Sequence, residues 1–60
     1  MQYYAHKIYY LRWGLHAVYR ITEQGVEGIL KDDVWRITGS VKTWDLVPIT
    51  EEEAFLWMFQ

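Results

Sequence analysis

Hydrophobic and polar positions alternate along this chain as in a series of short β-strands separated by polar turns. Five runs are rich in Tyr, Trp, Val, Ile and Thr, the residue types that suit a half-buried sheet, and they cover residues 3–11, 15–22, 26–31, 34–38 and 41–47. Four turn signals stand between them, at Arg12-Trp13-Gly14, Glu23-Gln24-Gly25, Asp32-Asp33 and Gly39-Ser40. Spacing of this kind predicts a five-stranded antiparallel meander.

Treating these turns as hairpin loops predicts which residues lie opposite one another. We assign three-residue loops ending at Gly14 and Gly25 and two-residue loops at the other two turns. One apolar row then crosses all five strands, and its members are Ile8, Val18, Leu30, Trp35 and Trp44. Because one buried face fixes the register of a sheet, we expect this row to form the core, with Ile37 and Leu46 beside it.

The end of the chain predicts a short helix. Pro48 cannot donate to a strand ladder and is expected to end the sheet. Thr50 followed by Glu53 is a capping-box pattern, and the three Glu residues of the first turn suit the positive end of the helix dipole. The helix should extend from Glu51 to Phe59. Its apolar residues cover nearly the whole circumference, so we expect it to be buried on more than one side.

The first run also fits a helix, because Tyr4, Ile8, Leu11 and Leu15 recur at helical spacing. Its Tyr-rich composition and the break at Gly14 favour a strand. The sequence therefore predicts a single domain over residues 1–60, of the α+β or mainly β class. In it, a five-stranded antiparallel meander, open or curled into a small barrel, carries a short C-terminal helix.

Composition adds an excess of large apolar side chains to this picture. Four Trp, five Tyr and two Phe occur among sixty residues, and a domain of that length buries only about 60% of the surface of its unfolded chain. Neither predicted sheet face is polar, and one short helix cannot cover both. Either the sheet curls into a barrel, or an apolar patch stays exposed for a partner. We expect a non-enzymatic protein-interaction module or regulator that binds another protein or itself, as a homodimer.

Candidate chemistry is sparse. The chain has no Cys, so disulfides and thiolate metal sites are excluded, and His6 and His16 would lie on the order of 13 Å apart along the predicted strands. The acidic residues are explained by the predicted turn and helix start. We therefore predict no enzyme, no catalytic residue, no metal and no cofactor. No signal peptide or membrane-spanning run is seen, which indicates a cytoplasmic protein.

Single-stranded nucleic-acid binding is the alternative function. Small barrels bind single strands by stacking bases on exposed aromatic residues beside basic ones. Five residues of the second sheet face could form such a surface: Lys7, Tyr9, Tyr19, Lys31 and Arg36. Against it, six bases are balanced by four acids within residues 1–42, four further acids follow, and the net charge is −2. We therefore favour a protein partner, with these five residues as the candidate binding set.

Two short segments resemble the end of an SH3 domain. Asp33-Val34-Trp35-Arg36 and Leu46-Val47-Pro48 match the part of that family where a Trp-containing strand leads through a hairpin to an apolar-Pro step. The resemblance covers residues 33–48. The ALYDY-type start and the acidic RT-type loop of the family are absent, and a helix follows Pro48, so no peptide-binding residue is carried over.

Overall fold

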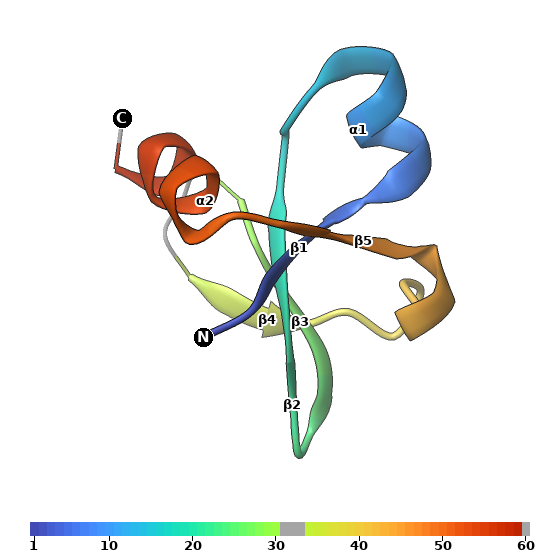
Figure 1. The fold of residues 1–60 in the computed structure, drawn as a ribbon. Coiled ribbons are helices and arrows are strands. Elements are labelled where there is room, and N and C mark those ends of the chain that lie inside the picture. The colour runs from blue at the N-terminus through green and yellow to red at the C-terminus, as the bar shows by residue number, and fades with distance from the viewer. Residues whose placement is uncertain (31–33, 60) are drawn as a thin grey trace.

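The computed structural model describes residues 1–30 and 34–59 and contains five strands, a 3-10 turn and two helices in those ranges (Figure 1). In chain order the elements are β1 (Tyr3–His6), α1 (Lys7–Trp13), β2 (Val18–Thr22), β3 (Gly25–Ile29), β4 (Trp35–Ile37), η1 (Thr43–Asp45), β5 (Leu46–Ile49) and α2 (Glu51–Met58). The predicted turn at Asp32-Asp33 lies outside the described residues.

The strands form one antiparallel sheet in the order β4-β3-β2-β1-β5. The first four strands follow one another as a meander, and the last strand returns to pair with the first over Tyr3–His6 and Leu46–Ile49. β4 and β5 are the two edges, so the sheet is open. The prediction of a five-stranded antiparallel sheet with a C-terminal helix is confirmed, in its open α+β form.

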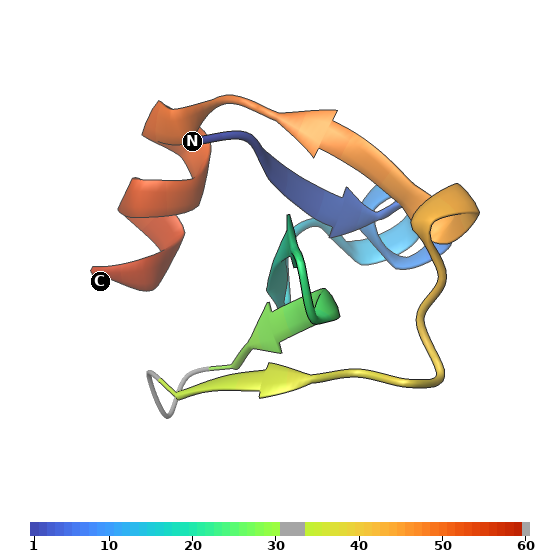
Figure 2. The ribbon, with the colours of Figure 1, turned by 90° about the horizontal axis from the view of Figure 1, so that it is seen from below.

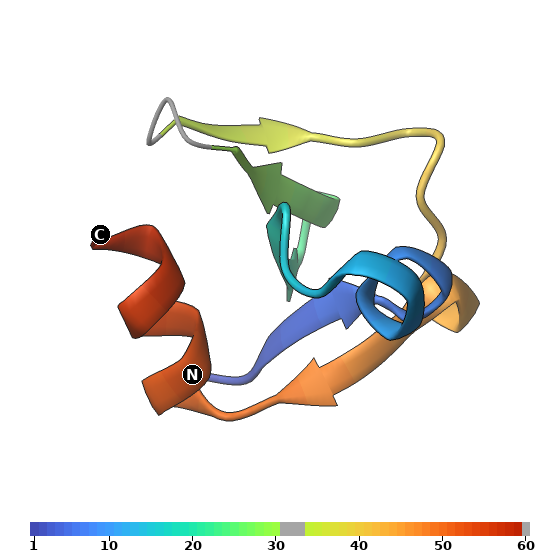
Figure 3. The same cartoon turned by 90° about the horizontal axis from the view of Figure 1, so that it is seen from above.

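Apolar side chains pack on both faces of this sheet. Figures 2 and 3 show α2 on one side of the curled sheet and the segment between β4 and β5 crossing the other. The α2 side holds the larger buried cluster, formed by Ala5, Val18, Ile29, Ile49, Ala54 and Trp57. The other side holds Ala17, Tyr19 and Val26, with Tyr4, Val41 and Leu46 packed against them. Each face thus has its own small core.

The first predicted strand is wrong beyond His6, where the chain turns into α1. β5 offers β1 only four partners, because η1 directly precedes Leu46, the partner of His6, and β2 pairs with β1 at Tyr4 and Tyr19. Beyond His6 the chain has no further strand partner within residues 1–30 and 34–59, and the helical spacing of its apolar residues favours α1. Gly14 ends α1 with φ +80°, and its N–H donates to the Tyr10 carbonyl at 3.0 Å. This glycine closes a helix and not a hairpin.

The predicted apolar row is also wrong, although two of its members lie in or against the core. Val18 is fully buried and Trp35 packs on the larger cluster, whereas Ile8, Leu30 and Trp44 are exposed. The β2–β3 turn contains two residues and not three, so Val18 faces Ile29. Gly39-Ser40 forms no hairpin, because β5 pairs with β1 and Trp44 stands on η1.

Pro48 lies inside β5, opposite Tyr4, and does not end the sheet as predicted. Its missing N–H is tolerated because β5 is an edge strand, and one side of such a strand has no ladder to complete. The chain leaves the sheet after Ile49, and α2 starts there.

Replacement of Trp57 and of Trp44 should have opposite consequences. Trp57 is 8% exposed and Trp44 is 71% exposed. Trp57→Ala should lower the free energy of unfolding by about 3–5 kcal/mol, as a large-to-small change in a core, and leave much of the protein unfolded. Trp44→Ala should change it by less than about 0.5 kcal/mol. Urea denaturation followed by circular dichroism measures both, and an equal loss in the two variants would contradict this packing.

Candidate functional site

The C-terminal helix α2 is fixed at its start by a local cap. The Thr50 hydroxyl oxygen accepts a hydrogen bond from the Glu53 N–H at 3.0 Å, as the capping-box pattern predicts. Glu51, Glu52 and Glu53 form its first turn, where the helix dipole favours negative charge. The predicted helix is therefore confirmed in type and position, and ends at Met58.

One side of α2 packs against the sheet and sets the rotation of the helix. Ala54 and Trp57 are its buried residues, and both belong to the larger core cluster. The Trp57 indole N–H donates to the Leu15 carbonyl at 3.1 Å, which gives the buried ring a polar anchor. The helix cannot rotate without breaking this contact.

The opposite side of α2 carries a groove, which we call the α2 groove. Glu52, Phe55, Leu56 and Phe59 line it, at the i, i+3, i+4 and i+7 positions of one helix face, and its open volume is about 460 Å³. Leu56 is 66% exposed and Phe59 is 79% exposed. The expectation that α2 is buried on more than one side is therefore unmet within a single chain.

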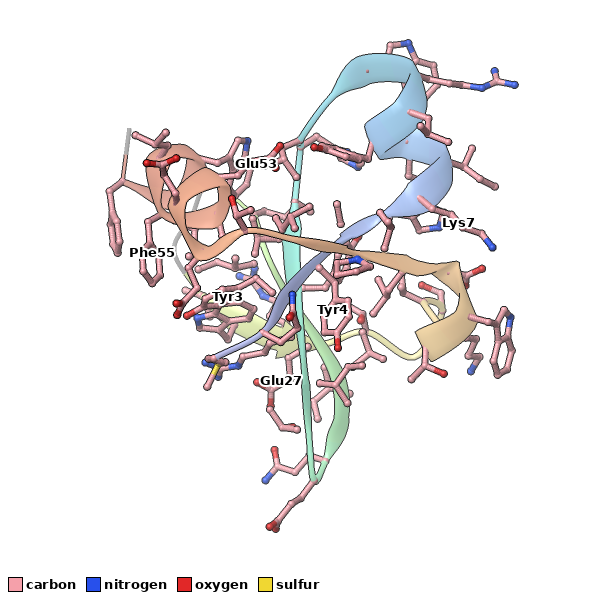
Figure 4. The ribbon with its side chains drawn as sticks, viewed as in Figure 1. Tyr3, Tyr4, Lys7, Glu27, Glu53 and Phe55 are labelled. Carbon is pink, nitrogen blue, oxygen red and sulfur yellow. The ribbon has the colours of Figure 1, made fainter. Side chains whose placement is uncertain are left out.

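A row of aromatic rings leads from this groove across the sheet. Phe59 lies 5.8 Å from Phe55 between ring centroids, Phe55 meets Tyr3 edge-on at 5.5 Å, and Tyr3 stacks on Trp35 at 6.4 Å. Figure 4 shows Phe55 and Tyr3 side by side at the junction of α2 and the sheet. The row joins the exposed groove to side chains that are anchored in the core.

At Trp35 the aromatic row ends in a cation–π contact. The Arg20 guanidinium lies 4.1 Å above the Trp35 ring, and its Nε donates to the Glu27 carboxylate at 2.7 Å. Glu27 is buried, so this pairing compensates its charge. Arg20 and Glu27 therefore satisfy one another and hold Trp35 in place.

The outer surface of α1 forms a second exposed apolar area, which we call the α1 surface. Its members are Lys7, Ile8, Leu11 and Arg12, which share one helix face, and no residue of α1 is buried. Trp13 is exposed on the other side of the helix, where it stacks on Tyr9. Leu11 is 83% exposed and Trp13 is 70% exposed. The Arg12 guanidinium lies 5.9 Å from the centroid of the Trp13 ring. A short, basic helix with large exposed side chains is the result.

Both histidines lie close to this helix and nearer to one another than the separation on the order of 13 Å that two predicted strands implied. His6 and His16 contact the same Tyr9 ring, with centroid distances of 4.6 and 5.1 Å, and Trp13 stacks on that ring at 5.8 Å. The predicted separation assumed an extended chain, and α1 shortens it. No group of three or more metal-ligating side chains occurs within residues 1–30 and 34–59.

The structure does not bring the five predicted binding residues onto one surface. Lys7 and Tyr9 are both exposed on α1, two residues apart and on different sides of the helix, and Arg36 is exposed on β4. Tyr19 is buried, with its ring over Gly28, where an added Cβ would come within 2.9 Å of it, so it presents no exposed face for stacking. Lys31 lies outside the described residues.

Sequence reasoning missed the residues that form the two exposed apolar areas. Leu56 and Phe59 were counted as helix-core candidates, because a helix that is apolar all round is normally covered on several sides. Ile8 and Leu11 were assigned to a strand. The sequence of α2 did carry a signal for this exposure. A helix that packs on a single sheet is covered on one side only, so an α2 that is apolar all round must leave apolar residues exposed.

The comparisons with known proteins add no relative. No protein-family model, no curated protein and no solved structure matches this chain. Neither helix of the described chain is long and apolar enough to cross a membrane.

One hydrogen bond ties α1 to α2. The Tyr10 hydroxyl donates to the Glu53 carboxylate at 2.6 Å. This bond, followed by desolvation and by the charge of Glu53, raises the pKa of Tyr10 above its ordinary value of 10.0. Burial, which desolvates the phenol, and then the electrostatic interaction with Tyr9 raise the pKa of Tyr19 as well. Both phenols thus keep their protons to higher pH in the folded state than in the unfolded chain.

Stability should fall at alkaline pH, in part through Tyr10. Above pH 10 the folded state binds more protons than the unfolded state, so the free energy of unfolding decreases as pH rises through the folded pKa. Below pH 10, Tyr10→Phe should be less stable than the wild type, because it loses the bond to Glu53. That difference should shrink as the pH rises further. Urea denaturation along a pH series measures it, and a difference that stays constant would contradict the assignment.

Proposed function

We propose that this protein is a non-enzymatic interaction module that binds another protein through the α2 groove. The observation that supports it is the exposure of Leu56 and Phe59 on a helix whose other side is anchored in the core. Contiguous apolar patches on a soluble protein are typical of interaction sites. A cytoplasmic location fits this proposal, because a chain without cysteine draws no stability from an oxidising compartment.

The groove has the chemistry of an interface centre. Burial of a Leu or Phe side chain stabilises a complex by about 1.5–3 kcal/mol, so the apolar residues of the groove could supply most of a modest binding energy. The helix is already ordered, which lowers the entropic cost of binding. Among the residues that the structure describes, Glu52 is the one charged residue on its wall. We therefore expect a partner that presents large apolar side chains together with a base.

The aromatic row extends this surface beyond α2. Tyr3 and Trp35 are partly exposed, and they are held by Phe55 on one side and by Arg20 on the other. Rigid aromatic residues contribute strongly at interfaces because they bury much area and lose little side-chain entropy. A partner longer than the groove would continue along this row.

Substitution inside the groove should abolish partner capture without unfolding the protein. The test compares immobilised wild type, Leu56→Ser/Phe59→Ser and Trp44→Ser in pull-downs from an extract of the cells that produce the protein. Trp44 is as exposed as the two groove residues but stands on η1, so it controls for loss of any apolar surface residue. We expect one or more proteins to be retained by the wild type and by Trp44→Ser, and lost with the groove variant.

Two outcomes of this comparison would count against the groove. The first is that the same proteins are captured by the wild type and by the groove variant. The second is that Trp44→Ser loses them as well, which would mean a diffuse apolar effect. Circular dichroism of each bait establishes that all three are folded, as expected for substitutions at exposed positions.

Single-stranded nucleic-acid binding by α1 is a second candidate, because Tyr9 and Trp13 stack there beside Lys7 and Arg12. Binding of this kind releases counterions, so its affinity falls steeply as salt rises. We expect no quenching of Trp fluorescence by a mixed oligonucleotide even at low salt, because α1 supplies only these two Lys and Arg side chains and α2 adds three carboxylates. Micromolar, salt-dependent quenching would favour the nucleic-acid function instead.

A further inference from the structure

We infer that the partner which fills the α2 groove is a second copy of this chain, and that it inserts its α1 surface. This inference rests on the proposed function of the groove and names its occupant. The exposed apolar areas on α1 and on α2 become the two halves of one contact between neighbouring copies.

The apolar parts of the two surfaces suit one another. Ile8 and Leu11 project from one face of α1 as exposed side chains, three residues apart, and α1 buries none of its residues within its own chain. The α2 groove offers Phe55, Leu56 and Phe59 around an open space of about 460 Å³. An exposed helix that lays apolar side chains into an apolar groove is a recurrent mode of recognition.

The charges of the two surfaces are opposite. Lys7 and Arg12 are the charged residues of α1, which has no acid, and α2 has three Glu residues and no base. Among the residues that the structure describes, neither Lys7 nor Arg12 forms an ion pair. Each surface therefore supplies the charge that the other lacks.

Glu52 is the carboxylate of α2 that remains for a partner. Glu51 pairs with the N-terminal amino group at 3.1 Å, and Glu53 accepts the hydrogen bond of Tyr10. Glu52 is exposed on the wall of the groove and makes no ion pair within the described ranges. A base delivered with an apolar helix would meet this carboxylate, and Arg12, which shares its helix face with Ile8 and Leu11, is such a base.

A chain cannot fill its own groove with its own α1. In Figure 4, Phe55 of the groove and Lys7 of α1 lie on opposite sides of the molecule. The contact must therefore join α1 of one copy to the groove of another. Made reciprocally it closes a two-fold dimer, and repeated head to tail it continues to further copies. We expect a dimer as the first species and larger assemblies at higher concentration.

Charge reversal on each surface tests this inference. Sedimentation equilibrium from micromolar to near-millimolar concentration should show a mass that rises above the 7.3 kDa monomer. Arg12→Glu and Glu52→Arg each place like charges at the contact, so each alone should weaken association at least about tenfold. In an equimolar mixture every contact can pair opposite charges again, and association should return. Glu23→Arg, at an exposed position on the β2–β3 turn, is the matched control and should associate like the wild type.

The outcomes separate this inference from the function on which it rests. A wild type that stays monomeric throughout overturns the inference, and groove-dependent capture of a different protein would then leave the proposed function intact. Association that both charge reversals leave unchanged also overturns it, because another surface must be responsible. Recovery in the mixture cannot come from misfolded variants, so it supports the pairing of Arg12 with Glu52 directly.

Discussion

The packing of Trp57 and Ala54 of α2 against the sheet is the contact on which the rest of the structure depends. These two side chains join residues of β1, β2, β3 and β5 in the larger core cluster, and the Trp57 indole also binds the Leu15 carbonyl. With so few fully buried residues, the domain has little stability to lose. The same contact fixes the rotation of α2, so the opposite face, with Leu56 and Phe59, must point to solvent. The exposed groove is thus a consequence of how the core is formed.

Local signals in the sequence were sufficient for some elements and not for others. The start of α2 was predictable because Thr50 lies three residues before Glu53 and its hydroxyl accepts the hydrogen bond of the Glu53 N–H. The β2–β3 hairpin was predictable from Gly25, apart from a shift of one residue in register. The change from β1 to α1 and the return of β5 beside β1 were not, because both depend on pairing between segments about forty residues apart. The solvent exposure of Trp44 follows from the same long-range pairing.

Prediction of the candidate site was limited by the same cause. An excess of aromatic surface was visible from composition, but its location depended on which faces the sheet and α2 cover. Tyr19 was predicted to be exposed and is buried, because the segment before β5 crosses that face of the sheet. His6 and His16 were predicted to lie far apart and share contact with Tyr9, because α1 shortens the chain between them. The choice between helix and strand for residues 7–13 therefore determines which side chains lie close together on the surface around α1.

An intermolecular distance measurement shows whether the α2 groove receives α1 of another copy. The chain has no cysteine, so His16→Cys, beside α1, accepts a single nitroxide label. Labelled protein at natural isotope abundance is mixed with unlabelled ¹⁵N protein, so that only contacts between copies broaden amide signals. We expect this contact to broaden the amide signals of Leu56 and Phe59, and not that of Gln24 on the distant β2–β3 turn. Broadening at Gln24 with α2 unaffected, or none in a sample that associates, would contradict it.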